Sequence, residues 1–145
     1  MRTPVRTLLK SKGPIVSIVP TESAREAMRL MGEQSVGSVL VRNAQGALLG
    51  IISERDCLRK VIMADRDPYK TPASDIMTSK LVTVPPECTV EECMALMTKN
   101  RIRHLPVMDH GNVAGVISIG DCVKFMVSEQ DQMIQNLEKY IEGSL

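Results

Sequence analysis

The chain has 145 residues and a mass of 16.0 kDa, which fits one compact domain or two small halves that share a core. Its 18 Lys and Arg and 17 Asp and Glu leave a formal net charge of +1, so the overall charge attracts neither nucleic acid nor anionic lipid. Aromatic residues make up only 2%, which argues against stacking of single-stranded nucleic acid bases. These values exclude a large multidomain enzyme and favour a globular domain that binds its ligands locally.

The sequence also indicates a compartment. It contains no run of 18 apolar residues and no secretory leader pattern, so we expect no membrane span and a cytoplasmic protein. The four cysteines, Cys57, Cys88, Cys93 and Cys122, form no C-x-x-C pair and have no histidine at zinc-finger spacing. We therefore expect reduced thiols and no metal site.

An internal repeat organises the chain. Residues 23–31 (S-A-R-E-A-M-R-L-M) align with 89–97 (T-V-E-E-C-M-A-L-M) at a shift of 66 residues. Residues 50–57 (G-I-I-S-E-R-D-C) align with 115–122 (G-V-I-S-I-G-D-C) at a shift of 65. Neither copy is large enough to bury a core alone, so the two copies should pack against each other.

The first long helix of each copy is predicted from an S/T-x-x-E capping box, Ser23 with Glu26 and Thr89 with Glu92. In such a box the hydroxyl accepts a backbone N–H and the glutamate returns to the N–H of the cap residue. Apolar residues then recur at i, i+3, i+4 and i+7, which predicts a face turned to the core. That face consists of Ala24, Ala27, Met28, Met31, Val90, Cys93, Met94 and Met97.

Two short strands follow each helix, at 38–41 and 48–53 in the first copy and at 104–107 and 113–118 in the second. Turns containing Gly46 or Gly111 join them, and another helix follows. Each copy is thus predicted as strand, helix, strand, strand, helix, a mixed α/β fold of the α+β kind. Pro68 and Pro72 mark a linker, and the expected divisions are 1–64, 65–73, 74–128 and a helical extension, 129–145.

A serine and an aspartate three residues apart end the last strand and begin the next helix in both copies: Ser53 and Asp56, Ser118 and Asp121. Unpaired N–H groups at a helix start attract phosphate. An ionised aspartate accepts hydrogen bonds from the two hydroxyls of a ribose. The same spacing is also a plain capping box that needs no ligand, but two copies after matched strands favour a nucleotide site.

The chain resembles the CBS-domain pair, named for cystathionine β-synthase, from about residue 8 to residue 128. The duplicated G-h-x-S/T-x-x-D motif carries the resemblance, with S-E-R-D at 53–56, R-I-R-H-L-P-V at 101–107 and Y-I-E-G at 140–143 pointing to stand-alone bacterial and plant-organelle members. The resemblance implies tandem repeats packed with pseudo-two-fold symmetry. It also implies a regulatory module that binds an adenosyl compound.

The resemblance further implies that each site takes its Ser/Asp pair from one repeat and much of its adenine pocket from the other. One site would combine Ser118, Asp121 and Val116 with Ser11, Lys12, Gly13, Val16, Val36 and Gly37. The mirror site would combine Ile51, Ser53 and Asp56 with Met77, Val82 and Ile102.

The two implied sites differ in charge. Arg103 and His104 begin a strand beside the first site, where the other repeat has Gly37 and Ser38. Arg55 is the nearest cation expected at the mirror site. We therefore expect phosphorylated ligands to prefer the Ser118/Asp121 site, because a charge-assisted bond to phosphate is a strong one.

The expected function is sensing of energy or redox state by an adenine nucleotide acting as effector, with AMP the first candidate and ATP, ADP, NAD or S-adenosylmethionine the others. No G-x-G-x-x-G and no P-loop occurs, so we expect no enzyme activity. The regulated partner protein is unknown, and neither nucleic acid nor membrane is expected as a partner. Two alternatives stay open: a thiol redox sensor using cysteines near helix starts, where a thiol pKa can fall, and a dimerisation scaffold that needs no ligand.

The C-terminal segment predicts a homodimer. Val123, Val127, Gln130, Ile134, Leu137 and Ile141 follow alternating steps of four and three, the seam spacing of helices that wrap around each other. Met126, Met133 and Tyr140 widen this stripe at intervals of seven residues. The stripe is broader than one small domain can cover.

Overall fold

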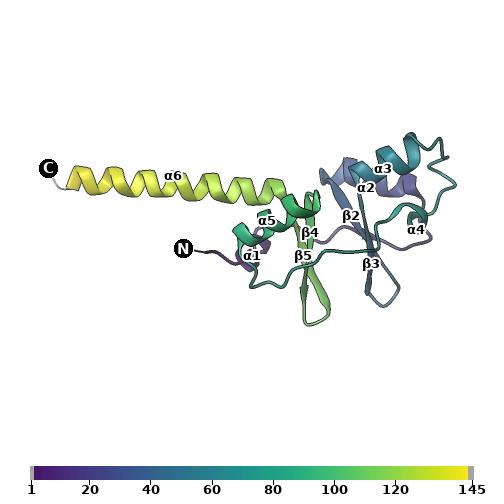
Figure 1. Cartoon of the computed structure of the whole chain (residues 1–145), viewed down its shortest axis with the longest axis horizontal. Coiled ribbons are helices and arrows are strands. Elements are labelled where there is room, and N and C mark those ends of the chain that lie inside the picture. Colours follow the sequence, from purple (N-terminus) through teal and green to yellow (C-terminus); the bar gives the residue numbers. More distant parts are fainter. Residues whose placement is uncertain (1, 144–145) are drawn as a thin grey trace.

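The computed structural model describes residues 2–143 as two small mixed halves, with a long terminal helix that extends away from them (Figure 1). The helices are α1 (Val5–Leu9), α2 (Ala24–Gln34), α3 (Glu54–Cys57), α4 (Ala73–Ile76), α5 (Val90–Asn100) and α6 (Ile119–Gly143); a π-helical turn (Leu58–Ile62) continues α3. The strands are β1 (Ser17–Ile18), β2 (Ser38–Arg42), β3 (Leu48–Ser53), β4 (His104–Asp109) and β5 (Asn112–Ser118). The predicted mixed fold of two repeats is confirmed.

The hairpins of the two repeats are built alike. β2 and β3 are antiparallel with Ser38 opposite Ser53, and β4 and β5 are antiparallel with His104 opposite Ser118. Each hairpin has one register shift at the same place along its first strand. Gly46 and Gly111 turn them with φ of +85° and +83°, a region where a side chain would be strained. Because the two registers match, both serines of the S-x-x-D motifs lie opposite the first residue of the neighbouring strand.

The two repeats differ in their first strand. β1 pairs in parallel with β2, with Ser17 opposite Leu40. In the second repeat the expected strand is reduced to a single parallel bridge between Val84 and Val107. Pro85 and Pro86 follow Val84, and a proline has no N–H to donate to a ladder. The prediction of a full first strand in both copies is therefore wrong for the second.

Both long repeat helices begin at the predicted caps. The side chains of Ser23 and Thr89 accept from the backbone N–H of Glu26 at 3.1 Å and Glu92 at 3.2 Å. The carboxylate of Glu26 turns to Arg29, which donates from Nε at 2.8 Å, instead of returning to the cap as the box predicts. The predicted core faces are confirmed, with Met28 and Met94 half-buried and the other members buried: Ala24, Ala27, Met31, Val90, Cys93 and Met97.

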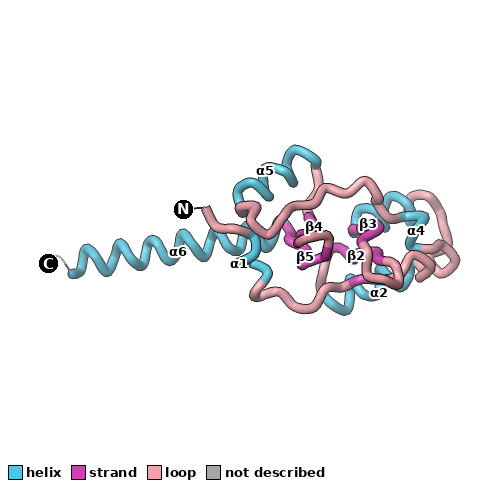
Figure 2. The backbone as a smooth tube through the Cα atoms, turned by 90° about the horizontal axis from the view of Figure 1, so that it is seen from below, coloured by secondary structure: helices cyan, strands magenta, loops and turns pink. Residues whose placement is uncertain are grey.

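The two cores exchange their leading segments. Val5 and Leu8 of α1 are buried in the core of the second repeat, whereas Ala73 and Ile76 of α4 are buried in the core of the first. Figure 2 shows α1 beside the half that holds β4 and β5. The two packed cores therefore do not follow the predicted sequence divisions at 64 and 74.

Equivalent glycines make this exchange possible. A Cβ on Gly115 would lie 2.5 Å from Leu9, and one on Gly50 would lie 2.7 Å from the sulfur of Met77. Each glycine thus lets the segment that leads into one repeat pack on the last strand of the other. Met1, Ser144 and Leu145, the ends of the outermost predicted divisions, lie outside the described residues.

Candidate functional site

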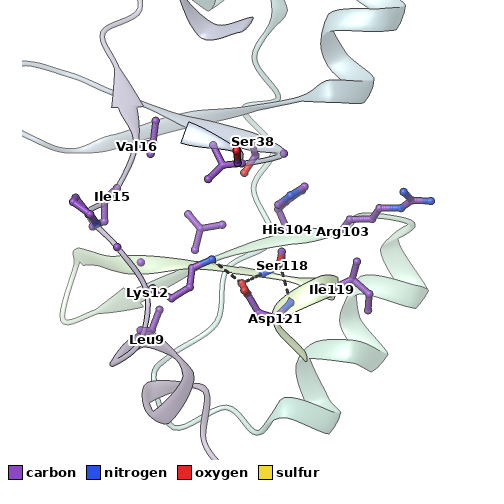
Figure 3. Close-up of a pocket in the computed structure, with 18 of the residues that line it drawn as sticks. Leu9, Lys12, Ile15, Val16, Ser38, Arg103, His104, Ser118, Ile119 and Asp121 are labelled. Atoms are coloured by element: carbon purple, nitrogen blue, oxygen red, sulfur yellow. Dashed lines mark hydrogen bonds and ion pairs between the residues drawn. The ribbon is translucent and has the colours of Figure 1, made fainter. Parts of the chain in front are cut away.

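A cavity of about 400 Å³ opens between the two repeats (Figure 3). Five parts of the chain meet there: the segment between α1 and β1, the start of β2, the start of α3, the start of β4, and the end of β5 with the first turn of α6. The size is within the usual range of small-molecule sites. Ten of the predicted residues line it: Lys12, Gly13, Val16, Val36, Gly37, Arg103, His104, Val116, Ser118 and Asp121.

Ser118 and Asp121 form the polar wall. The backbone N–H of Ser118 donates to Asp121 Oδ2 at 2.8 Å, and the N–H of Asp121 donates to Ser118 Oγ at 3.1 Å. This is a capping box at the start of α6. Lys12 reaches across from the segment after α1 and donates from Nζ to the same Oδ2 at 2.8 Å. Because these bonds end on Oδ2, the other oxygen, Oδ1, is not needed for the helix start or for the lysine.

Asp121 is held ionised. Burial disfavours its charge, but the Lys12 ammonium and the Ser118 N–H outweigh burial and lower the pKa of the carboxyl below its ordinary value. The side chain of Asp121 keeps 24% of its surface exposed. A partly exposed, charged acceptor in a cleft is suited to bind the hydroxyls of a ligand.

His104 and Gly37 form the junction between the repeats. A Cβ on Gly37 would lie 2.9 Å from both His104 Nε2 and Glu54 Oε1, so the missing side chain makes room for both groups. Burial lowers the pKa of His104, and the charge of Glu54 opposes that shift. His104 is therefore mainly neutral at pH 7. Arg103 stands at the rim, and its guanidinium points away from Asp121 (Figure 3).

The opposite wall of the cavity is aliphatic, with Val16, Val36 and Val116 joined by residues that the sequence did not single out. These are Leu9, Pro14, Ile15, Ala114 and Ile119, and polar Ser35, Ser38 and Glu54 also line the cavity. No local signal identifies them, because they come from four distant segments. Ser11, which was expected in this pocket, instead donates its hydroxyl to the Leu8 carbonyl at 3.2 Å.

The mirror motif is closed on itself. Asp56 Oδ2 accepts from the N–H of Ser53 at 2.9 Å and from its hydroxyl at 3.1 Å. Asp56 Oδ1 accepts from Thr78 Oγ1 at 3.2 Å and pairs with Lys60 Nζ at 3.0 Å. Only 13% of the Asp56 side chain is exposed. Both of its oxygens are therefore used within the protein.

The other residues expected at the mirror site are divided between the two cores. Ile51 exchanges backbone hydrogen bonds with Thr78, and Met77 lies against Gly50. Val82 and Ile102 pack on the core of the second repeat. Arg55, expected as the phosphate cation, is exposed and donates to the Arg101 carbonyl at 3.5 Å. Lys60, four residues after Asp56 in the chain, is the cation that reaches this carboxylate.

The cysteines do not have the low pKa that a redox sensor needs. All four are free and buried. Burial raises the pKa of Cys57 and of Cys122 to about 11, and it also raises those of Cys88 and Cys93. Among residues 2–143 no cluster of three or more His, Cys, Asp or Glu side chains is placed to hold a metal ion, and no described helix is long and apolar enough to cross a membrane.

A comparison to protein families agrees with the internal repeat. The family model for the CBS domain matches residues 5–62 and 73–128. The chain belongs to the CBS-domain family. CBS-domain pairs are in general regulatory modules that bind ligands.

Relatives of this CBS pair support the assignment. The mitochondrial CBS domain-containing protein CBSX3 of Arabidopsis thaliana is 40% identical over 150 residues, which covers 97% of this chain and 73% of that protein. A solved structure of a candidate signal-transduction protein with CBS domains from Burkholderia ambifaria has 40% identity and a TM-score of 0.84, covering 88% of this chain and 96% of that one. A hexameric CBS-CP12 protein from bloom-forming cyanobacteria has 28% identity and a TM-score of 0.74, covering 83% and 69%.

Proposed function

We propose that this CBS pair is a regulatory module that binds an adenine nucleotide in the cavity closed by Ser118 and Asp121. The observation that carries the proposal is the Asp121 carboxylate. It is ionised, a quarter exposed, and placed at the N-terminus of a long helix at the edge of a cavity. A ribose supplies the donors that this carboxylate accepts, and a phosphate suits the helix N-terminus beside it.

The remaining walls fit the other parts of a nucleotide. An adenine ring would lie between the aliphatic side chains of Val16, Val36 and Val116, because no Phe, Tyr or Trp lines the cavity. Lys12 already stands 2.8 Å from Asp121 and can turn its ammonium to a phosphate, while Arg103 at the rim can reach a longer phosphate chain. AMP is the ligand of first choice for a cavity of about 400 Å³.

The proposed role is sensing without chemistry. The ligand would change the stability or assembly of the module, and a separate protein would respond to that change. A dinucleotide such as NAD would be held through its adenosine half. A cytoplasmic location stays a prediction, and the Arabidopsis relative is named as mitochondrial.

Isothermal titration calorimetry tests the proposal with AMP, ADP, ATP, NAD and S-adenosylmethionine. We expect saturable binding of at least one adenosyl compound, and weaker binding of its 2′-deoxy form, because the lost hydroxyl leaves an acceptor of Asp121 unused. Guanosine monophosphate is the matched control for the base. Equal binding of ribose and deoxyribose forms would remove Asp121 from the proposed role, and no binding of any member would overturn the function.

A further inference from the structure

The outer part of α6 carries an apolar face that the rest of the described chain does not cover. Every described residue from Met126 to the end of α6 is exposed. Val127, Ile134 and Leu137 have more than half of their surface exposed. Figures 1 and 2 both show this part of the helix extending beyond the body. An isolated helix of such composition is not stable by propensity alone and gains its stability from packing.

This face is distinct from the one that anchors α6 to its own core. Cys122 is fully buried, and Ile119 and Phe125 pack on the core of the second repeat. The seam that runs through Val123, Gln130 and Ile141 is turned by about 100° from Cys122, at 100° per residue. The core-facing side therefore ends near Phe125, whereas the seam continues to the end of the helix.

We propose that α6 pairs with α6 of a second copy of this chain in an antiparallel coiled coil, with the two-fold axis beside Gln132. In this register every seam residue faces another. Val123 faces the partner's Ile141, Val127 faces the partner's Leu137, and Gln130 faces the partner's Ile134. The paired length, 123 to 141, is about 27 Å at 1.5 Å per residue.

The residues that flank the seam select the antiparallel direction. Lys124 comes beside the partner's Glu138, which gives two ion pairs related by the axis. Met126 comes beside the partner's Tyr140, and the two copies of Met133 meet near the axis. In a parallel pair Lys124 and Glu138 would lie about 21 Å apart along the axis, so no such ion pair would form.

One flanking contact opposes this arrangement. The two copies of Asp131 meet near the axis, where like charges repel. In a parallel pair these residues lie on opposite outer flanks and do not meet. The same register brings the end of the partner's helix level with the first turn of α6, which carries Asp121.

Sedimentation of the full chain at micromolar concentration tests the pairing. We expect a dimer for the natural chain and a monomer for Ile134→Glu. The matched control is Gln135→Glu, which adds the same charge to the side of the helix away from the seam and should leave the dimer intact. Because residue 134 is exposed, Ile134→Glu should keep the melting temperature of the body. A monomeric natural chain, or a dimer that survives Ile134→Glu, would overturn the proposal.

Charge exchange tests the direction. Lys124→Glu and Glu138→Lys should each weaken dimerisation about tenfold, because two exposed ion pairs become repulsive, and the double variant should restore it. Asp131→Asn should strengthen the dimer. A dimer that is insensitive to the charge at 124, 131 and 138 would overturn the antiparallel register, and one lost only through Leu58→Glu would place the interface on the first repeat instead.

Discussion

The two S-x-x-D motifs have the same local structure and different surroundings. In both, the serine N–H bonds the aspartate and the aspartate N–H bonds the serine hydroxyl. The second carboxylate oxygen of Asp56 contacts Thr78 and Lys60. Lys12 instead contacts the same oxygen of Asp121 that accepts the Ser118 N–H. A motif that fixes a helix start therefore does not by itself fix whether its carboxylate can bind a ligand.

The different partners of the two aspartates can be assigned to equivalent positions in the repeats. Lys12 and Thr78 occupy equivalent places, 66 residues apart, in the segments that lead into the two repeats. Lys60 is equivalent to Phe125, 65 residues on, which packs on a core instead of reaching the carboxylate. The first repeat thus neutralises its aspartate from its own helical segment, and the second does so from a distant segment of the chain.

The largest effect should come from removing the open site. Ser118→Ala combined with Asp121→Ala should abolish most of the AMP-induced rise in melting temperature, since losing bonds to a charged acceptor costs about 1–3 kcal/mol of binding, or about tenfold to hundredfold in affinity. Ser53→Ala with Asp56→Ala should remove less of that rise. Thermal shift with and without AMP measures both double variants, and the opposite order would contradict the proposed difference between the two sites.

The stability of the free protein should show the reverse order. Asp56→Ala should lower the free energy of unfolding by about 1–3 kcal/mol, because it leaves Thr78 and Lys60 without their acceptor. Asp121→Ala should cost less, since that carboxylate is more exposed. Urea denaturation of the two variants without ligand decides this, and equal losses would show that the Thr78 and Lys60 contacts add no stability.

The lysine can be exchanged for its counterpart. Lys12→Thr places at this position the residue type of its equivalent, Thr78. It should weaken AMP binding about tenfold, because it removes a positive charge beside the proposed phosphate. Adenosine, which has no phosphate, should lose much less. Calorimetry with the two ligands separates these effects, and an equal loss for both would show that Lys12 acts on the shape of the cavity.

The smallest effect is expected from pH. The pKa of His104 is lowered in the folded protein, so the unfolded chain binds more protons between that lowered value and about 6.5. The contribution of His104 to the free energy of unfolding should therefore be complete above about pH 6.5 and should be lost as pH drops through the folded pKa. His104→Gln should flatten that part of the curve, and AMP should also flatten it, because phosphate favours the charged imidazole. An unchanged slope in His104→Gln would assign the dependence to another group.

Much of the fold could be predicted because it is encoded over a few residues. The caps at Ser23 and Thr89, the Gly46 and Gly111 turns and the core faces of α2 and α5 all depend on bonds or periodicities within one helix or hairpin. The one wrong strand is also local in cause: two prolines cut the first strand of the second repeat to a single bridge. The duplicated motif further indicated where a site should be.

Only the tertiary structure decided which copy of the motif stays open. The partners of Asp56 and Asp121 lie 22 and 109 residues away at Thr78 and Lys12, and the two cores exchange α1 and α4. Such contacts depend on how whole elements pack, through glycines such as Gly50 and Gly115 that admit a neighbouring side chain. The sequence by itself determined the repeat and the chemistry of the motif, because hydrogen bonds and helix periodicity act over a few residues. The accessibility of each carboxylate depends on chain segments that meet only after folding.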